Sequence, residues 1–137
     1  MEKYYSKVQP DLLLHIVFRF QDFANSRVDI IEPDNFLQCA ALRLTEGETF
    51  RPHKHIAREV TDLDRKAQES WMVIRGVIEC TFYDIDDTIL DRVVIKEGDA
   101  SFTLHGGHTY TVLEDNTFVM EYKSGKYEGQ AKDKIFI

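Results

Sequence analysis

Two histidines separated by one residue form the densest group of chemistry-bearing side chains in the sequence. His53 and His55 follow Pro52, and side chains two positions apart point to the same face of an extended segment. Two imidazoles on one face can hold the same cation, and they also suit proton transfer near neutral pH. The pair predicts a functional site, with two solvated surface histidines after a proline as the alternative.

A carboxylate heads one of the apolar segments. Glu69 lies just before a run rich in Trp, Met, Val and Ile, and Gly76 follows after six intervening residues. Burying a carboxylate is costly unless it is paired or bound to a metal. Glu69 is therefore a second candidate ligand, and the alternative is an exposed strand start with the carboxylate in water.

A third candidate ligand comes directly after a Gly-Gly turn. A strand-like segment runs into Gly106 and Gly107 and continues at His108. Glycines allow the backbone to pass close to another group at the end of a strand. His108 is preferred as the third imidazole because it opens a strand and can point into a barrel, and His105 is the reserve metal ligand. Both could instead be solvated turn histidines.

Cationic residues gather around the histidine pair, although the whole chain has a formal net charge of −7. Arg51, Lys54 and Arg58 are the candidates for substrate binding, because Arg and Lys suit phosphate or carboxylate groups. A solvated loop of mixed charge is the alternative.

The last predicted strand has one charged and one apolar face. Phe118, Met120 and Tyr122 share one face, and Glu121 and Lys123 share the other. If the charged face lines the interior, Glu121 can serve acid/base catalysis and Lys123 can contact substrate. Because the other face is entirely apolar, we expect that face to pack inward and the charges to be solvated.

Short strands must position these side chains. Gly, Pro and polar turn signals recur between apolar runs of strand length, and helical periodicity is weak throughout. Strands are expected over residues 28–31, 36–44, 70–74, 77–83, 89–95, 100–104, 109–113 and 117–122. Residues 2–9 are the best helical candidate, and 12–20 is ambiguous between helix and strand. The series predicts an all-β protein, an antiparallel barrel or sandwich with little helix.

Composition excludes several classes of function. The chain has 137 residues, with 17 basic and 24 acidic side chains, so a broad electrostatic grip on nucleic acid is not expected. Its longest apolar run, 12–18, is interrupted by His15 and falls short of the ~20 residues that span a bilayer. The first residues lack the apolar core of a signal peptide, and two distant cysteines suit reduced thiols, so we expect a cytoplasmic protein.

The candidate ligands follow an order that resembles a known family. Gly47, His53, His55, Glu69 and Gly76, followed by a later strand that ends in histidine, resemble the two motifs of the cupin superfamily. The thirteen residues between His55 and Glu69 are more than cupins usually have there, and the histidine of the second motif arrives one residue early.

The resemblance extends to small single-domain cupins that accompany surface-polysaccharide and nucleotide-sugar biosynthesis. Gly106-Gly-His, Leu113-Glu-Asp and the ending Asp133-Lys-Ile-Phe are similar to that group. It implies a cupin-type antiparallel double-stranded β-helix, a jelly roll barrel, over residues 36–137. Residues 1–35 are then an N-terminal extension that packs on the barrel or on a dimer partner.

The resemblance and the ligand types together imply a metal site. His53, His55, Glu69 and His108 would hold one divalent transition metal, Fe, Mn, Ni, Co or Zn, which suit a mixed set of nitrogen and oxygen ligands. The expected activity is isomerisation or epimerisation of a sugar-derived anionic molecule, such as a sugar phosphate or nucleotide sugar. Glu121 and Tyr110 would assist proton movement.

Two other readings stay open. In a metal-free nucleotide-sugar ketoisomerase, a further cupin activity, His53 and His55 would act as acid and base. A non-enzymatic cupin would only bind a small ligand. In each case we expect a homodimer, because exposed sheet edges need to be covered. Residues 12–20 are expected to cover the sheet edge of the partner, and residues 135–137 to form a second contact.

Overall fold

The computed structural model describes residues 1–23, 27–32, 35–42, 46, 52, 67–124 and 135–137. The strands are β1 (Glu2–Tyr5), β2 (Leu13–Phe18), β3 (Arg27–Asp29), β4 (Ala40–Leu42), β5 (Glu69–Arg75), β6 (Val77–Tyr83), β7 (Ile89–Lys96), β8 (Ala100–Thr103), β9 (Gly107–Val112) and β10 (Phe118–Lys123). The only helix in that part of the chain is a short 3-10 turn, η1 (Phe20–Asp22). The expected all-β class with little helix is confirmed.

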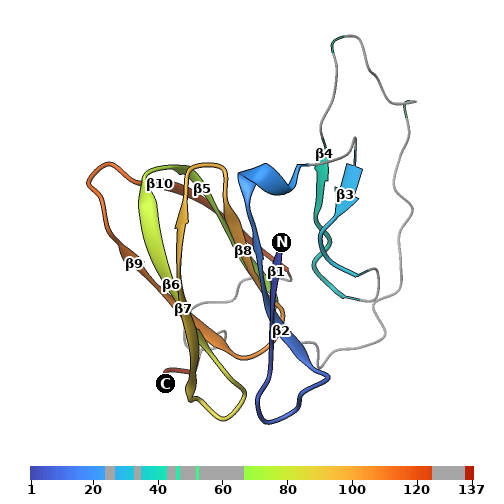
Figure 1. Ribbon diagram of the computed structural model, residues 1–137, viewed down its shortest axis with the longest axis vertical. Coiled ribbons are helices and arrows are strands. Elements are labelled where there is room, and N and C mark those ends of the chain that lie inside the picture. The colour runs from blue at the N-terminus through green and yellow to red at the C-terminus, as the bar shows by residue number, and fades with distance from the viewer. Residues whose placement is uncertain (24–26, 33–34, 43–45, 47–51, 53–66, 125–134) are drawn as a thin grey trace.

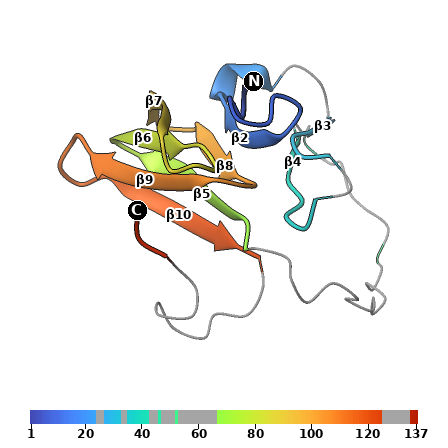
Figure 2. The ribbon, with the colours of Figure 1, turned by 90° about the horizontal axis from the view of Figure 1, so that it is seen from below.

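The strands form three antiparallel sheets (Figure 1). The five-stranded sheet has the order β1-β2-β8-β5-β10, the three-stranded sheet has the order β7-β6-β9, and β3 and β4 form a hairpin. Figure 2 shows the five-stranded sheet between the other two sheets. The histidine pair and the cations Arg51, Lys54 and Arg58 lie outside the described residues.

The N-terminal segment differs from the expectation in one respect. Residues 2–5 form β1, where a helix was the better local candidate, because they pair with β2 from Glu2↔Val17 to Tyr5↔Leu13. Pairing with an existing strand outweighs a weak helical preference. The ambiguous run 12–20 contributes β2 to the interior of the five-stranded sheet.

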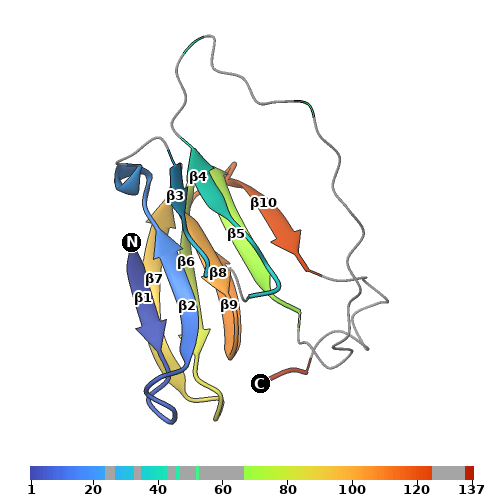
Figure 3. The same ribbon diagram turned by 90° about the vertical axis from the view of Figure 1, so that its right-hand side faces the viewer.

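Two apolar cores lie on opposite faces of the five-stranded sheet. The inner core, against the three-stranded sheet, includes Val17, Val73, Ile78, Cys80, Phe82 and Ile95. The outer core, under the β3–β4 hairpin, includes Ile16, Phe18, Ile30, Ile31, Ala41, Ala100 and Phe102. β2 contributes to both cores, which explains why apolar residues occupy both of its faces, with His15 as the one polar residue. Figure 3 shows the hairpin in front of β2 and β8, while β10 lies beside it.

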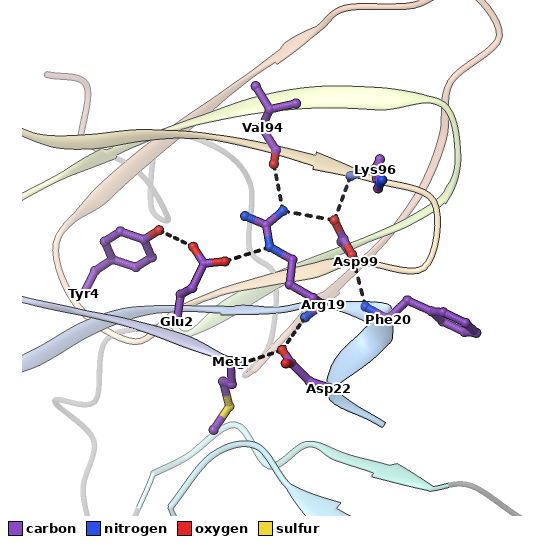
Figure 4. A network of polar contacts seen from close by, with 9 residues as sticks. All are labelled: Met1, Glu2, Tyr4, Arg19, Phe20, Asp22, Val94, Lys96 and Asp99. Atoms are coloured by element: carbon purple, nitrogen blue, oxygen red, sulfur yellow. Dashed lines mark hydrogen bonds and ion pairs between the residues drawn. The ribbon is translucent and has the colours of Figure 1, made fainter. Parts of the chain in front are cut away.

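A buried aspartate joins the end of β2 to the turn after β7. Asp99 accepts hydrogen bonds from the Phe20 backbone N–H at 3.1 Å and the Lys96 N–H at 3.1 Å, and it pairs with the Arg19 guanidinium at 3.1 Å (Figure 4). Arg19 also pairs with Glu2 at 2.8 Å and donates to the Val94 carbonyl at 2.8 Å. One margin of the two facing sheets is thereby held together by side chains.

A second buried aspartate acts at the other end of the β1–β2 hairpin. Asp84, in the turn after β6, accepts from the Ser6 hydroxyl at 2.6 Å and the Lys7 N–H at 2.6 Å. Burial alone would raise the pKa of the Asp84 carboxyl. The hydrogen bonds from Ser6, Lys7 and neighbouring N–H groups outweigh burial and hold this pKa below its ordinary value.

His15 is a neutral histidine buried within this framework. Its ring stacks on Phe82 at 4.4 Å, Nδ1 lies 3.2 Å from the Thr103 hydroxyl, and Nε2 lies 3.2 Å from the Tyr83 carbonyl oxygen. Burial lowers the pKa of His15 to about 4. Its role is structural, since both ring nitrogens have partners within the fold.

Two described glycines have conformations and surroundings that a side chain would not tolerate. Gly76, between β5 and β6, has φ of 92°, and a Cβ there would overlap Thr117. Gly106, before β9, has φ of 73°, and a Cβ would overlap the Tyr83 carbonyl oxygen. Both glycines belong to the motifs noted in the sequence: Gly76 follows the strand that carries Glu69, and Gly106 precedes the strand that carries His108.

No helix among the described residues is long and apolar enough to cross a membrane. Of the two cysteines, both free, Cys80 is buried and Cys39 is half-buried. Burial raises the pKa of both thiols, which disfavours the reactive thiolate.

We predict that Asp84→Asn lowers the free energy of unfolding by about 1–3 kcal/mol at pH 7, because the amide cannot accept all the bonds that the carboxylate accepts. Urea denaturation at 25 °C measures the loss. Because the pKa of Asp84 is lowered in the fold, its stabilisation is present above the ordinary value of 3.8 and is lost as the pH falls below it. Asp87→Asn, an exposed charge change in the same turn, is the control, and equal losses in the two variants would contradict the assignment.

We predict a separate pH dependence from His15. Between pH 6.5 and about 4, His15 is protonated in the unfolded chain but stays neutral in the folded protein. The free energy of unfolding therefore falls as the pH falls through this window. The loss is on the order of 3 kcal/mol. His15→Gln should flatten this part of the profile, as measured by urea denaturation of chelator-treated protein from pH 7 to pH 4. Parallel profiles for wild type and variant would overturn the prediction.

Candidate functional site

A buried carboxylate and an imidazole form the centre of the candidate site. Glu69 is 5% exposed, and its Oε1 lies 3.1 Å from His108 Nε2. Trp71 Nε1 donates to the same oxygen at 3.0 Å, and Lys123 Nζ lies 3.6 Å from Glu69 Oε2. Two of the four predicted metal ligands are thus in direct contact, with a cation beside them.

The strand register explains why Glu69, His108 and Lys123 lie close together. Lys123 pairs with Glu69 across β10 and β5, so both side chains emerge on the same face. Val73 belongs to the inner core, and alternation therefore turns Glu69 and Trp71 inward as well. On β9, His108 pairs with Phe82 of the inner core. The site lies between the two facing sheets, with side chains from each.

The expected orientation of β10 is wrong. Phe118, Met120 and Tyr122 are 57%, 48% and 48% exposed, so the apolar face points outward. The opposite face turns toward the interior, where Lys123 is half-buried against Glu69. The register with β5 determines this orientation, because Glu121 pairs with Trp71 and Lys123 with Glu69.

Glu121 occupies the inward-turned face of β10 but remains exposed. It lies two residues before Lys123, on the same side of the strand. The two predicted groups from β10 therefore come to the same face as Glu69. The candidate roles of Glu121 in proton movement and of Lys123 in substrate contact are compatible with this arrangement.

Tyr110 lies beside the site in a polar and aromatic contact network. Its ring stacks on Trp71 with centroids 4.1 Å apart and 13° between the planes, and its hydroxyl lies 3.1 Å from Ser101 Oγ. Burial raises the pKa of Tyr110 far above its ordinary value, so the hydroxyl stays protonated. This environment suits holding Trp71 in place, and Trp71 in turn orients Glu69.

Sequence reasoning missed the contribution of Trp71 as a hydrogen-bond donor. The available signal was the spacing of two between Glu69 and Trp71, which places both on one face of a strand. Ser101, the partner of Tyr110 on β8, carried no comparable signal, because its inward direction follows from pairing with Trp71.

The two candidate imidazoles after β8 have different surroundings. His108 contacts Glu69, while His105 lies in the turn, where its backbone N–H donates to the Leu14 carbonyl at 3.3 Å. His108 Nδ1 is buried and has no hydrogen-bond partner among the residues that the structure describes. The Glu69 contact supports His108 over His105 as the third imidazole.

The geometry of the pair fits shared ligation of a metal ion. Ligand bonds of about 2.0–2.2 Å at right angles place two donor atoms about 3 Å apart. The separation of 3.1 Å between Glu69 Oε1 and His108 Nε2 matches that edge. The described residues contain no group of three or more such ligands, and the remaining two candidates, His53 and His55, lie outside them.

We predict that Tyr110→Phe lowers the free energy of unfolding by about 1 kcal/mol, because it removes the hydroxyl from Ser101 and leaves the ring stack intact. Ser101→Ala and the double variant complete a double-mutant cycle in urea denaturation. A coupling energy of about 1 kcal/mol is expected between the two side chains. Additive losses would contradict a direct bond.

Comparison with known proteins finds no relative: no family model, curated protein or solved structure matches this chain. The chemistry assigned to the site therefore depends on its own residues.

Proposed function

We propose that this protein is a metal-binding enzyme of the cupin type that isomerises or epimerises a sugar-derived anionic small molecule. The observation that carries the proposal is the contact between Glu69 and His108, with the Lys123 ammonium beside the same carboxylate. Their strands would belong to a jelly roll barrel, consistent with two antiparallel sheets that face each other.

The residues that would hold the metal are Glu69 and His108 together with His53 and His55. Bound there, a divalent transition metal would polarise a substrate carbonyl or lower the pKa of a bound water. Trp71 would keep the carboxylate in position, since its indole N–H donates to Glu69 Oε1 at 3.0 Å.

The cationic residues would bind the anionic part of the substrate. Lys123 supplies an ammonium at the site, and Arg51, Lys54 and Arg58 are the further candidates. A phosphate or carboxylate suits such a group of cations. Glu121, exposed on the same face of β10 as Lys123, would accept or return a proton at a substrate carbon next to a carbonyl.

The same contacts favour a second candidate, a metal-free ketoisomerase. A carboxylate needs a partner when it is buried, and Glu69 already has three: His108, Trp71 and Lys123. A Glu69–His108 pair can serve as a general acid or base without a metal, alongside His53 and His55.

Metal analysis of tag-free protein, prepared without chelator and supplied with Fe, Mn, Co, Ni and Zn salts, decides between the two candidates. We expect one divalent ion per chain, and at least a tenfold loss of affinity in His108→Ala and in Glu69→Gln. His105→Ala is the matched control and should retain full metal content. Trp71, the only tryptophan, lies beside Glu69, so its fluorescence should respond to metal in wild type.

The outcomes separate the candidates. Full occupancy in both His108→Ala and Glu69→Gln would overturn the metal assignment. If wild type binds none of the supplied ions, the metal-free mechanism is favoured. Loss of metal in His105→Ala, with full retention in His108→Ala, would transfer the ligand role to His105.

Incubation with sugar phosphates and nucleotide sugars in D₂O tests the reaction itself. Isomerisation or epimerisation through proton abstraction should incorporate deuterium from solvent into the sugar, which mass spectrometry detects. His108→Ala should reduce the rate at least a hundredfold. Lys123→Met should raise KM more than it lowers kcat, because its proposed role is to bind the anionic group. Binding of these compounds without incorporation would instead support a non-enzymatic binding protein.

A further inference from the structure

The outer faces of the two facing sheets differ sharply in polarity. The exposed outward positions of the three-stranded sheet are mainly polar or charged, with Arg92, Lys96, Thr109 and Thr111 beside one apolar residue, Val94. The inner positions of the same strands are apolar, among them Ile78, Cys80, Phe82 and Ile95. This alternation is normal for an antiparallel sheet with one face in water.

The five-stranded sheet does not follow this pattern on its outer face. Two rows of paired residues cross it: Ile16–Phe102–Ser70–Tyr122 and Phe18–Ala100–Met72–Met120. The β3–β4 hairpin covers the first two positions of each row, which belong to the outer core. In the first row the next residue, Ser70, is polar and buried, and beyond it Tyr122 is half-exposed; in the second row Met72 and Met120 are both partly exposed.

We define the β5–β10 apolar face as Met72, Phe118, Met120 and Tyr122. These side chains are 36%, 57%, 48% and 48% exposed. None of the four carries a charge, although the chain has a net charge of −7. Contiguous apolar surface of this kind marks an interaction site on a soluble protein.

We propose that the β5–β10 apolar face is the interface between two copies of this chain, related by a two-fold axis. Such an axis brings the same patch of both copies together, and an uncharged patch lets two strongly acidic chains approach without like-charge contact at its centre. None of the residues that form the face is a cation, and the one Arg paired with them, Arg75 opposite Phe118, is too little to attract nucleic acid or an anionic membrane.

The extent of the face fits the centre of a dimer interface. Four large side chains, about half-exposed, leave on the order of 350 Å² of apolar surface per chain. A standard interface buries about 800 Å² per partner, with an apolar centre and a polar rim. The face supplies the centre, and surrounding polar groups such as Arg75 at the end of β5 are placed to form part of the rim.

The segments that the sequence suggested for dimerisation lie elsewhere. Residues 13–18 form β2, whose residues from Leu14 to Phe18 are buried in the chain's own sheet, so they are not free to cover a partner. The terminal triplet Ile135, Phe136 and Ile137 is 97%, 77% and 64% exposed, and Ile137 lies beside Gly107 at the start of β9. The proposed interface is thus formed by different strands.

Light scattering coupled to size exclusion, over a range of protein concentrations, tests the proposal on the full chain. Wild type should have twice the 16.0 kDa mass of the chain. Met120→Glu places a carboxylate at the centre of the face in both copies and should raise the dissociation constant at least a hundredfold. Met72→Glu, the neighbour across the strand pair, should have the same effect.

Val94→Glu is the matched control. Val94 is an apolar residue, 50% exposed, on the polar outer face of the three-stranded sheet, so its substitution should leave the dimer intact. Circular dichroism confirms that each variant remains folded, as expected for half-exposed positions.

Three results would overturn the proposal. The first is a wild-type mass of 16.0 kDa at every concentration, which would mean that no second copy covers the face. The second is a dimer that survives both Met120→Glu and Met72→Glu. The third is equal dissociation by Val94→Glu, since that would point to the other sheet. Metal binding at Glu69 and His108 is measured separately, so the failure of either proposal leaves the other standing.

Discussion

The arrangement of the two facing sheets depends on one constraint. Asp99 and Asp84 attach the β1–β2 hairpin to the three-stranded sheet. Each carboxylate is almost completely buried, and each accepts from groups that lie far away along the chain. A carboxylate in such surroundings is tolerated only when its oxygens are well bonded. The bonds therefore require the ends of the hairpin to meet the turns of the three-stranded sheet, which fixes how the two sheets face each other along this margin.

The candidate site lies on the other side of this framework. The five-stranded sheet places β1 and β2 at one margin and β10 at the other, and the site takes its residues from β5, β9 and β10. At the β1–β2 margin, the buried carboxylates of Asp99 and Asp84 accept several hydrogen bonds each. At the β10 margin, the partners of Glu69 include two titratable side chains, His108 and Lys123. The first arrangement gives rigidity, and the second leaves groups that can exchange protons or bind an ion.

The sequence predicts local features well and long-range ones poorly. Residues 77–83 were expected as a strand and form β6, because a glycine and a polar turn bound an apolar run. The orientation of β10 could not be obtained in this way. Alternation shows that Phe118, Met120 and Tyr122 share a face, but not which face points inward. The usual rule that apolar residues point inward failed, because the outer face of this sheet is apolar as well.

The site was predicted only in part for the same reason. The positions of Glu69 and His108 relative to glycines suggested ligands, whereas the approach of Lys123 to Glu69 depends on the register between β5 and β10. Residues 2–5 gave no local sign of a strand and gain that structure from pairing with β2. Local patterns therefore identify candidate groups, and strand pairing decides which of them meet.

The two oxygens of Glu69 have different partners, so this one carboxylate on β5 contacts side chains from both β9 and β10. Oε1 lies near the Trp71 indole N–H and His108, while Oε2 lies nearest to the Lys123 ammonium. An anionic group that binds to Lys123 competes with Oε2 for this positive charge. Such an anion would change the charge around the carboxylate that contacts His108 at 3.1 Å. The proposed substrate contact on β10 and the imidazole on β9 therefore meet at a single buried side chain.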